Sequence, residues 1–165
     1  MAQPKIKDIK VILTEPDNIR LVVVKLITDQ DGLYGVGCAT FTQRPLQVAK
    51  AITEYLRPFL IGRKVTDIED IWQSCYVSSY WRNGPVLNNA LSGIDQALWD
   101  IKGKALGVPV YELLGGLTRD KVVCYPHIGG RHDLDELARC AKQAVDEGWR
   151  FVRWGMCDPA GSGVL

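Results

Sequence analysis

Hydrophobic and polar residues alternate along the first forty positions, and this pattern predicts β-strands. Apolar side chains occupy every second position of residues 9–13, as expected of a half-buried strand. Residues 19–28 carry branched side chains on both faces, which indicates a more central strand. Asp31 and Gly32 then supply a turn, so that residues 33–39 return as a third strand. We therefore expect the chain to open with antiparallel strands, the last two forming a hairpin.

Two glycines, Gly35 and Gly37, interrupt the third predicted strand. They weaken it, because a glycine has no side chain to pack on the sheet. A glycine inside a strand is also typical of a place that another backbone approaches closely. Both positions are therefore candidates for such an approach.

The hydrophobic spacing becomes helical beyond the third strand. Residues 46–60 carry apolar side chains at helical spacing. Pro45 is acceptable in the first turn of this helix, and Pro58 is expected to end it. A short helix is predicted over residues 109–114.

Two further helices lie between these segments. The first is predicted over residues 66–79, where Thr66 and Glu69 have the spacing of a capping box. The longest is predicted over residues 85–106, because its apolar residues form one stripe. Gly107 follows that stripe and is expected to stop the helix.

The order of elements changes in the last third of the chain. Residues 122–127 form a compact apolar segment, residues 134–145 an amphipathic one, and residues 151–154 a second apolar one. Strand, helix and strand with short connections predict a βαβ unit and a parallel sheet. We therefore predict two domains, at residues 1–117 and 118–165.

Composition excludes several classes of protein. The chain has 165 residues, of which 47% are hydrophobic and 24% charged, as in an ordinary globular protein. A formal net charge of +1 gives no reason to expect nucleic acid or a membrane as partner. The longest apolar runs are far shorter than the roughly 20 residues of a membrane span. The five cysteines are scattered and odd in number, which favours reduced thiols and a cytoplasmic location.

Two polar residues fall where a parallel barrel meets its ligands, at the C-terminal ends of predicted strands. His127 ends one strand and Arg153 lies near the end of the next. An imidazole there could donate to a substrate oxygen or move a proton, and a guanidinium could bind a carboxylate. A structural interpretation is equally open, in which His127 only ends its strand and Arg153 pairs with a structural carboxylate.

Two loops carry further candidates. Residues 80–85 form a polar and aromatic loop in which Trp81 could line a pocket or pack inward as a corner. Residues 40–44 include Thr42 and Arg44, whose polar groups could meet a polyhydroxylated ligand or serve only in a turn. No predicted strand end carries a cluster of Asp or Glu, so we predict no Mg²⁺ site made by these residues.

Several segments resemble a known family. Residues 90–104, ALSGIDQALWDIKGK, and residues 107–116, GVPVYELLGG, resemble the signature of the mandelate racemase/muconate lactonizing enzyme branch of the enolase superfamily. Residues 68–72 and 80–85 are similar to the mannonate dehydratase group and its relatives named starvation-sensing proteins. The resemblance extends from about residue 5 to residue 153.

The resemblance implies a fold and a reaction. The fold is an α+β capping domain, with a three-stranded antiparallel meander and helices, followed by the start of a (β/α) TIM-type barrel. The implied reaction abstracts the proton next to the carboxylate of a sugar acid and then eliminates water. Mg²⁺ stabilises the enolate, and its ligands would lie beyond Leu165. A barrel needs about 250 residues, so the chain is expected to be the N-terminal part of a larger enzyme and to be inactive by itself. The larger enzyme is expected to be a homo-oligomer.

The resemblance also assigns roles to residues. His127 matches the pocket histidine that follows the first barrel strand, and Arg153 the arginine after the second strand that assists a tyrosine base. Trp81 matches a pocket tryptophan from the capping domain. Thr42 stands where mannonate dehydratases carry an asparagine that contacts substrate, so gluconate-like acids become candidates. A non-catalytic metabolite-binding or regulatory relative on the same scaffold is the alternative.

Overall fold

The computed structural model describes residues 3–129 and 133–154. The chain divides into two compact units, residues 1–117 and residues 118–165. Each unit is described by itself. His132, which its position just before the predicted helix of residues 134–145 indicates to be a surface residue, lies outside the described ranges.

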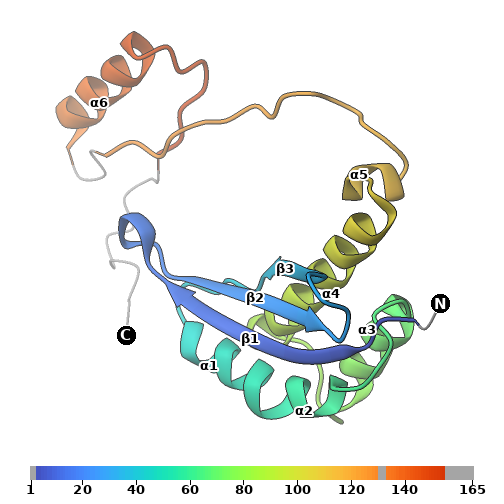
Figure 1. The fold of residues 1–165 in the computed structure, drawn as a ribbon. Helices are drawn as coiled ribbons and strands as arrows, with labels where there is room; N and C mark the ends of the chain where they lie inside the picture. The colour runs from blue at the N-terminus through green and yellow to red at the C-terminus, as the bar shows by residue number, and fades with distance from the viewer. Residues whose placement is uncertain (1–2, 130–132, 155–165) are drawn as a thin grey trace. The chain divides into compact units, whose positions relative to one another are not determined.

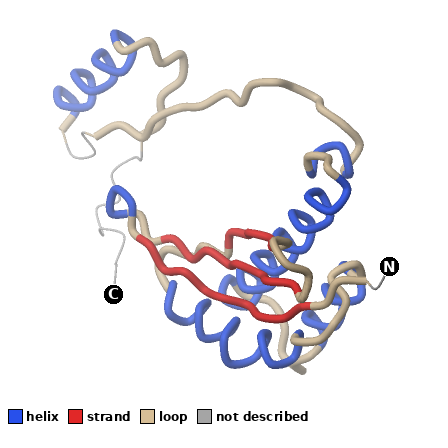
Figure 2. The backbone as a smooth tube through the Cα atoms, in the orientation of Figure 1, coloured by secondary structure: helices blue, strands red, loops and turns tan. Residues whose placement is uncertain are grey.

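The first unit is built on a three-stranded antiparallel sheet in the order β1-β2-β3, so the predicted meander is confirmed (Figure 1). Helices pack on the sheet, as Figure 2 shows in blue against the red strands. In chain order the elements of this unit are β1 (Ile6–Thr14), a 3₁₀ turn η1 (Pro16–Asn18), β2 (Leu21–Thr28), β3 (Tyr34–Cys38), α1 (Pro45–Lys50), η2 (Ala51–Leu56), α2 (Arg57–Leu60), α3 (Ile68–Val77), α4 (Pro85–Leu106) and α5 (Val110–Leu113).

Burial alternates along the central strand, as its position in the sheet requires. Val22, Val24 and Leu26 are fully buried, while the residues between them are only partly covered. In β1 a register shift follows Ile6, and the burial expected over residues 9–13 does not reach Leu13, which is exposed. The core therefore lies on one face of the sheet, between the strands and the helices.

The helix predicted over residues 46–60 forms, but its hydrogen-bond pattern is uneven. It begins as α1, continues through the π-helical segment η2 and ends as α2 at Leu60. Pro58 was expected to end it, and the helix continues for two residues more. Proline has no N–H to donate to the preceding turn, and its ring crowds the carbonyl of Glu54, four residues earlier. A π-helical segment ahead of the proline is a known way to absorb such a break.

The start of α3 differs from the prediction. The residue before this helix is Asp67, and its side chain makes no capping hydrogen bond. The hydroxyl of Thr66 donates to the carboxylate of Asp67 at 3.1 Å, so the predicted capping box of Thr66 and Glu69 is wrong. Buried Ile68 and Ile71 hold the first turns of the helix in the core instead.

The longest helix, α4, has the predicted bounds. Proline at its first turn and Gly107 after its last turn mark them, and Gly107 has the left-handed conformation (φ 70°) that ends many helices. The helix lies against β3, and three glycines make the contact close. A Cβ at Gly35 would come within 1.9 Å of the carbonyl oxygen of Ala97, and a Cβ at Gly37 within 2.0 Å of that of Gly93. The close backbone approach predicted for Gly35 and Gly37 is therefore confirmed.

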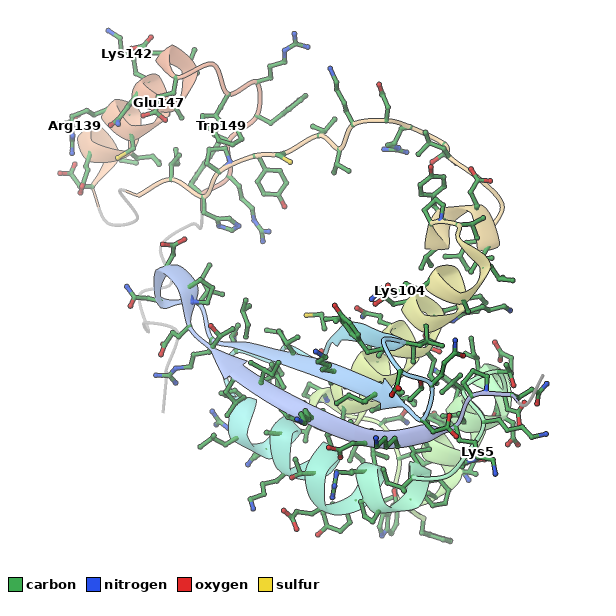
Figure 3. All side chains as sticks on the ribbon, viewed as in Figure 1. Lys5, Lys104, Arg139, Lys142, Glu147 and Trp149 are labelled. Atoms are coloured by element: carbon green, nitrogen blue, oxygen red, sulfur yellow. The ribbon has the colours of Figure 1, made fainter. Side chains whose placement is uncertain are left out.

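The second unit contains one helix, α6 (Leu134–Asp146), within its described part. Asp133 caps it, because its carboxylate accepts hydrogen bonds from the backbone N–H groups of Asp135 at 2.9 Å and Glu136 at 3.4 Å. Figure 3 shows Arg139 and Lys142 on this helix and Glu147 just after its end.

The two strands predicted on either side of α6 do not form as strands. Residues 122–127 and 151–154 meet only at one parallel bridge, between His127 and Arg153. Two barrel strands alone are expected to leave their apolar side chains uncovered, and Val122 and Phe151 are indeed exposed, by 78% and 55% of their surface. Parallel strands occur in sheets with both faces covered, and the described part of this unit does not supply that cover. The strand prediction is therefore wrong for these residues, except at the bridge.

Candidate functional site

The bridge between His127 and Arg153 brings together the two residues predicted at strand ends. The backbone N–H of Arg153 donates to the carbonyl of Pro126 at 3.0 Å, and the carbonyl of Arg153 accepts from the N–H of Ile128 at 2.9 Å. Arg153 is thus bonded to the residues before and after His127, which is the pattern of a parallel pair. The side chains of such a pair lie next to each other, and both are exposed here.

A third side chain, Tyr125, joins this pair. The guanidinium Nη1 of Arg153 donates to the phenol oxygen of Tyr125 at 3.4 Å. The rings of Tyr125 and His127 have centroids 6.0 Å apart. Sequence reasoning assigned no role to Tyr125. The available signal was its spacing, because residues two apart on extended backbone point to the same side.

Thr42 and Arg44, in the predicted loop after β3, make hydrogen bonds within the turn of that loop. The hydroxyl of Thr42 donates to the side-chain oxygen of Gln43 at 3.0 Å, and Arg44 donates to the backbone carbonyl of Gln43 at 2.8 Å. The hydroxyl of Thr40 accepts from the backbone N–H of Val22 at 3.1 Å. The turn interpretation left open from the sequence is thus supported for Thr40, whose hydroxyl holds the loop to β2.

A cavity of about 720 Å³ lies beside this loop. Arg44 and Gln43 line it together with Arg20, which lies just before β2, and Arg20 forms an ion pair with Glu15 at 3.2 Å. Thr42 is not among the lining residues. The arginines give the cavity the positive groups that an acid ligand requires, although Glu15 offsets one of them.

Trp81 lies on the loop between α3 and α4. The residue is 83% exposed, and its ring meets the ring of Tyr80 edge to face, with centroids 5.3 Å apart. The inward-packed corner considered from the sequence is therefore wrong for Trp81. Its neighbours Arg82 and Asn83 line a cavity of about 640 Å³.

That cavity is mainly apolar, and a thiol forms part of its wall. Burial raises the pKa of the Cys75 thiol to about 11, an effect that the nearby charge of Arg63 partly opposes. A thiol with so high a pKa stays protonated at neutral pH, so Cys75 is suited to packing and not to nucleophilic chemistry.

The four predicted site residues are therefore divided between the two units. His127 and Arg153 are neighbours in the unit of residues 118–165. Thr42 and Trp81 belong to separate loops of the unit of residues 1–117, and neither lines the cavity beside its loop.

Across residues 3–129 and 133–154, no group of three or more His, Cys, Asp or Glu side chains is arranged to hold a metal ion. Among the helices in these ranges, none has both the length and the apolar character needed to cross a membrane.

Comparison with known proteins identifies relatives of the whole chain. Residues 2–115 match the model of the mandelate racemase / muconate lactonizing enzyme N-terminal domain. A D-galactonate dehydratase family member from Pantoea ananatis is 57% identical over 159 residues, which are 96% of this chain and 38% of that protein. One from Musicola paradisiaca is 55% identical, over 99% of this chain and 39% of its own length. The chain thus spans less than two-fifths of the length of these curated relatives.

A solved structure agrees with these sequence matches. The crystal structure of an enolase from Pantoea ananatis with bound D-gluconate and Mg superposes with a TM-score of 0.86 and 58% identity. The superposition covers 93% of this chain and 37% of that one. The family resemblance and the capping-domain fold inferred from the sequence are confirmed.

Proposed function

Because the chain belongs to the mandelate racemase / muconate lactonizing enzyme family of the enolase superfamily, we propose that it is the N-terminal part of a Mg²⁺-dependent sugar-acid dehydratase. The observation that carries the proposal is the parallel bridge that sets His127 and Arg153 side by side. Ligands of parallel barrels meet the ends of neighbouring strands, which is where this pair would lie. The proposed substrate is a C6 aldonic acid, mannonate- or gluconate-like.

The proposal divides the chain in two. Residues 1–117 would form the capping domain, with its sheet and helices. Residues 118–165 would form the first βα unit and the second strand of the barrel. The two compact units of the chain, residues 1–117 and 118–165, support this division.

The proposed reaction is a dehydration. A base removes the proton on the carbon next to the carboxylate, and the hydroxyl of the neighbouring carbon takes a proton from an acid beyond Leu165 and leaves as water. The enol that remains becomes a ketone, so that the product is a 2-keto-3-deoxy acid. That proton is weakly acidic, and catalysis therefore requires positive charge close to the developing anion.

The roles of the four site residues are part of the proposal. Arg153, which is charged at any accessible pH, would lower the pKa of the neighbouring base, a tyrosine beyond Leu165. His127 would donate to a substrate oxygen. Trp81 would supply an apolar wall to the pocket, and Thr42 would face the substrate hydroxyls with its own.

The remaining parts of the proposal come from the family. The Mg²⁺ ligands are proposed to come from beyond Leu165, because the described residues do not fit the ion. The parent protein is proposed to be a cytoplasmic homo-oligomer that acts on small molecules, with neither nucleic acid nor membrane as partner. The scattered, odd set of cysteines supports the cytoplasmic location.

A non-catalytic metabolite-binding protein is the second candidate. Thr42 favours it, since this hydroxyl is bonded to Gln43 at a position where mannonate dehydratases carry an asparagine. Such a protein would bind aldonic acids without turning them over.

The test uses the full-length parent with Mg²⁺ and a panel of C6 aldonic acids. We expect a 2-keto-3-deoxy product from at least one acid, and none from residues 1–165 alone. Arg153→Ala is expected to reduce kcat by about a hundredfold or more, as loss of a group that stabilises charge commonly does. Lys142→Ala, on α6, is the matched control. A parent that binds an aldonic acid in calorimetry but never releases product would establish the binding protein instead.

A further inference from the structure

Tyr125 is not among the four predicted site residues, but its side chain contacts the guanidinium of Arg153. The parallel bridge fixes the backbone of Arg153 next to His127, but it leaves the long side chain free to rotate. The guanidinium turns back along the neighbouring segment and donates from Nη1 to the phenol oxygen of Tyr125 at 3.4 Å. This contact places the guanidinium beside the phenol of Tyr125.

The chemical nature of the group bonded to Arg153 determines whether the guanidinium keeps its net charge. A carboxylate beside Arg153 would bind the guanidinium in two places and neutralise it. A phenol is a neutral acceptor at ordinary pH, so the arginine keeps its full charge for a substrate or a base. Immobilising a free arginine costs rotamer entropy, and a residue that restrains it beforehand reduces this cost during the reaction.

The three side chains form one row. Tyr125 and His127 are two residues apart, with ring centroids separated by 6.0 Å, and Arg153 lies beside both. A change at Tyr125 therefore acts on the guanidinium without removing either proposed site group. Phenylalanine at this position would keep the ring and lose only the acceptor.

We infer that Tyr125 is a positioning residue for Arg153, holding its guanidinium at the end of the strand through the phenol oxygen. The inference rests on the proposed function in one respect, namely that Arg153 acts on the reaction. It adds a residue to which the sequence pattern assigned no role.

The experiment is a double-mutant cycle in the full-length parent, with Tyr125→Phe, Arg153→Ala and the double variant. We expect Tyr125→Phe to lower kcat by about tenfold while KM changes less than about twofold, because a hydrogen bond to a charged group is lost. The acidic limb of the pH profile should move to higher pH, since a displaced guanidinium lowers the pKa of the base less. The double variant should be no slower than Arg153→Ala alone, because Tyr125 acts through Arg153.

Tyr111→Phe is the matched control, since Tyr111 is a similarly exposed tyrosine on α5. It should leave kcat and the pH profile unchanged. If Tyr125→Phe behaves like this control in an active parent, the inference is wrong and the proposed function stands. Additive effects in the cycle would overturn it as well.

An inactive parent would instead refute the proposed function. The same cycle is then measured on the dissociation constant of D-gluconate, and on crystal structures of the parent and Tyr125→Phe if no binding is found. A guanidinium that keeps its position without the phenol oxygen would overturn the inference in that case. A displaced guanidinium would support it independently of activity.

Discussion

The carboxylate of Asp100, on α4, accepts a hydrogen bond from the backbone N–H of Val36, on the outer edge of β3, at 2.8 Å. Gln96, one helical turn earlier, binds both backbone groups of Cys38, at 3.0 and 3.3 Å. Side chains four residues apart on a helix lie in one row, and this row follows the strand.

Lys104, labelled in Figure 3, extends the row by one more turn. Its ammonium donates to the backbone carbonyl of Tyr34 at 3.0 Å and to Asp100 at 2.7 Å. An edge strand normally presents unpaired backbone groups that can recruit another strand. The helix α4 thus satisfies part of the outer edge of β3 with side chains.

Asp100→Ala is expected to destabilise residues 1–165 by about 1–3 kcal/mol, because a backbone N–H loses a charged acceptor. Asp100→Asn keeps an acceptor and should cost less. Urea unfolding followed by circular dichroism measures the free energy of unfolding. Lys102→Ala, an exposed change on the same helix, is the control and should cost under about 0.5 kcal/mol. An Asp100→Ala variant as stable as this control would show that water replaces the carboxylate without loss.

Gly37→Ala tests the close approach of α4 to β3. The new Cβ would come within 2.0 Å of the carbonyl oxygen of Gly93, so that helix and strand must separate. We expect a loss of about 3 kcal/mol or more in the free energy of unfolding, among the largest effects of overpacking.

Gly129→Ala serves as the control for this clash. There the new Cβ would meet only the sulfur of Cys140, at an ordinary contact distance of 3.7 Å. Thermal unfolding of both variants should show a large drop in Tm for Gly37→Ala and little change for Gly129→Ala. Equal drops would show that the clash with the carbonyl oxygen of Gly93 does not determine the cost.

The sequence was sufficient where its signals were local. The bounds of α4 could be predicted because Pro85 and Gly107 act on their own turns of the chain. The hydrogen bond of Asp100 could not, because Val36 is 64 residues away and α-helical spacing says only that Asp100 lies on some face. The π-helical segment before Pro58 could not be predicted for another reason. Proline signals a break in the helix but does not specify how the helix absorbs it.

The candidate site shows the same contrast between local signals, which a sequence pattern contains, and contacts between distant residues, which it does not. His127 and Arg153 could be proposed from the sequence because each lies at or near the end of a short apolar segment. Their contact with Tyr125 depends on the rotamer of a long side chain, which a sequence pattern does not specify. The strands themselves failed to form because their pairing depends on cover that a local apolar pattern cannot supply.

Cys75 is expected to resist alkylation in the folded protein. Burial raises its pKa from 9.0 to about 11, so its thiolate fraction below pH 9 falls by about a hundredfold. Iodoacetamide labelling at pH 8, followed by peptide mass spectrometry, should modify exposed Cys38 well before Cys75. In urea the two thiols should react at similar rates. Equal labelling without urea would contradict the burial of Cys75.

The ion pair of Asp8 and Arg57 predicts a small dependence of stability on pH. Arg57 Nε donates to the Asp8 carboxylate at 2.8 Å, and this bond lowers the pKa of Asp8 below 3.8 although partial burial opposes it. The unfolded chain thus binds a proton to Asp8 more readily than the folded one. The stabilisation is fully present above about pH 5, and it is lost as the pH falls through the folded pKa.

Arg57→Gln should therefore have a lower free energy of unfolding than the unsubstituted chain at pH 7. This difference should become smaller at lower pH. We expect a difference under about 1 kcal/mol, since both side chains are partly exposed and the pair is screened by salt. Urea unfolding between pH 2 and pH 7 measures it. Lys7→Gln removes a neighbouring exposed charge on β1 that does not bind Asp8, and its difference from the parent should stay nearly constant with pH. If Arg57→Gln gives the same flat difference, Asp8 titrates alike in the folded and unfolded chains and the ion pair contributes nothing.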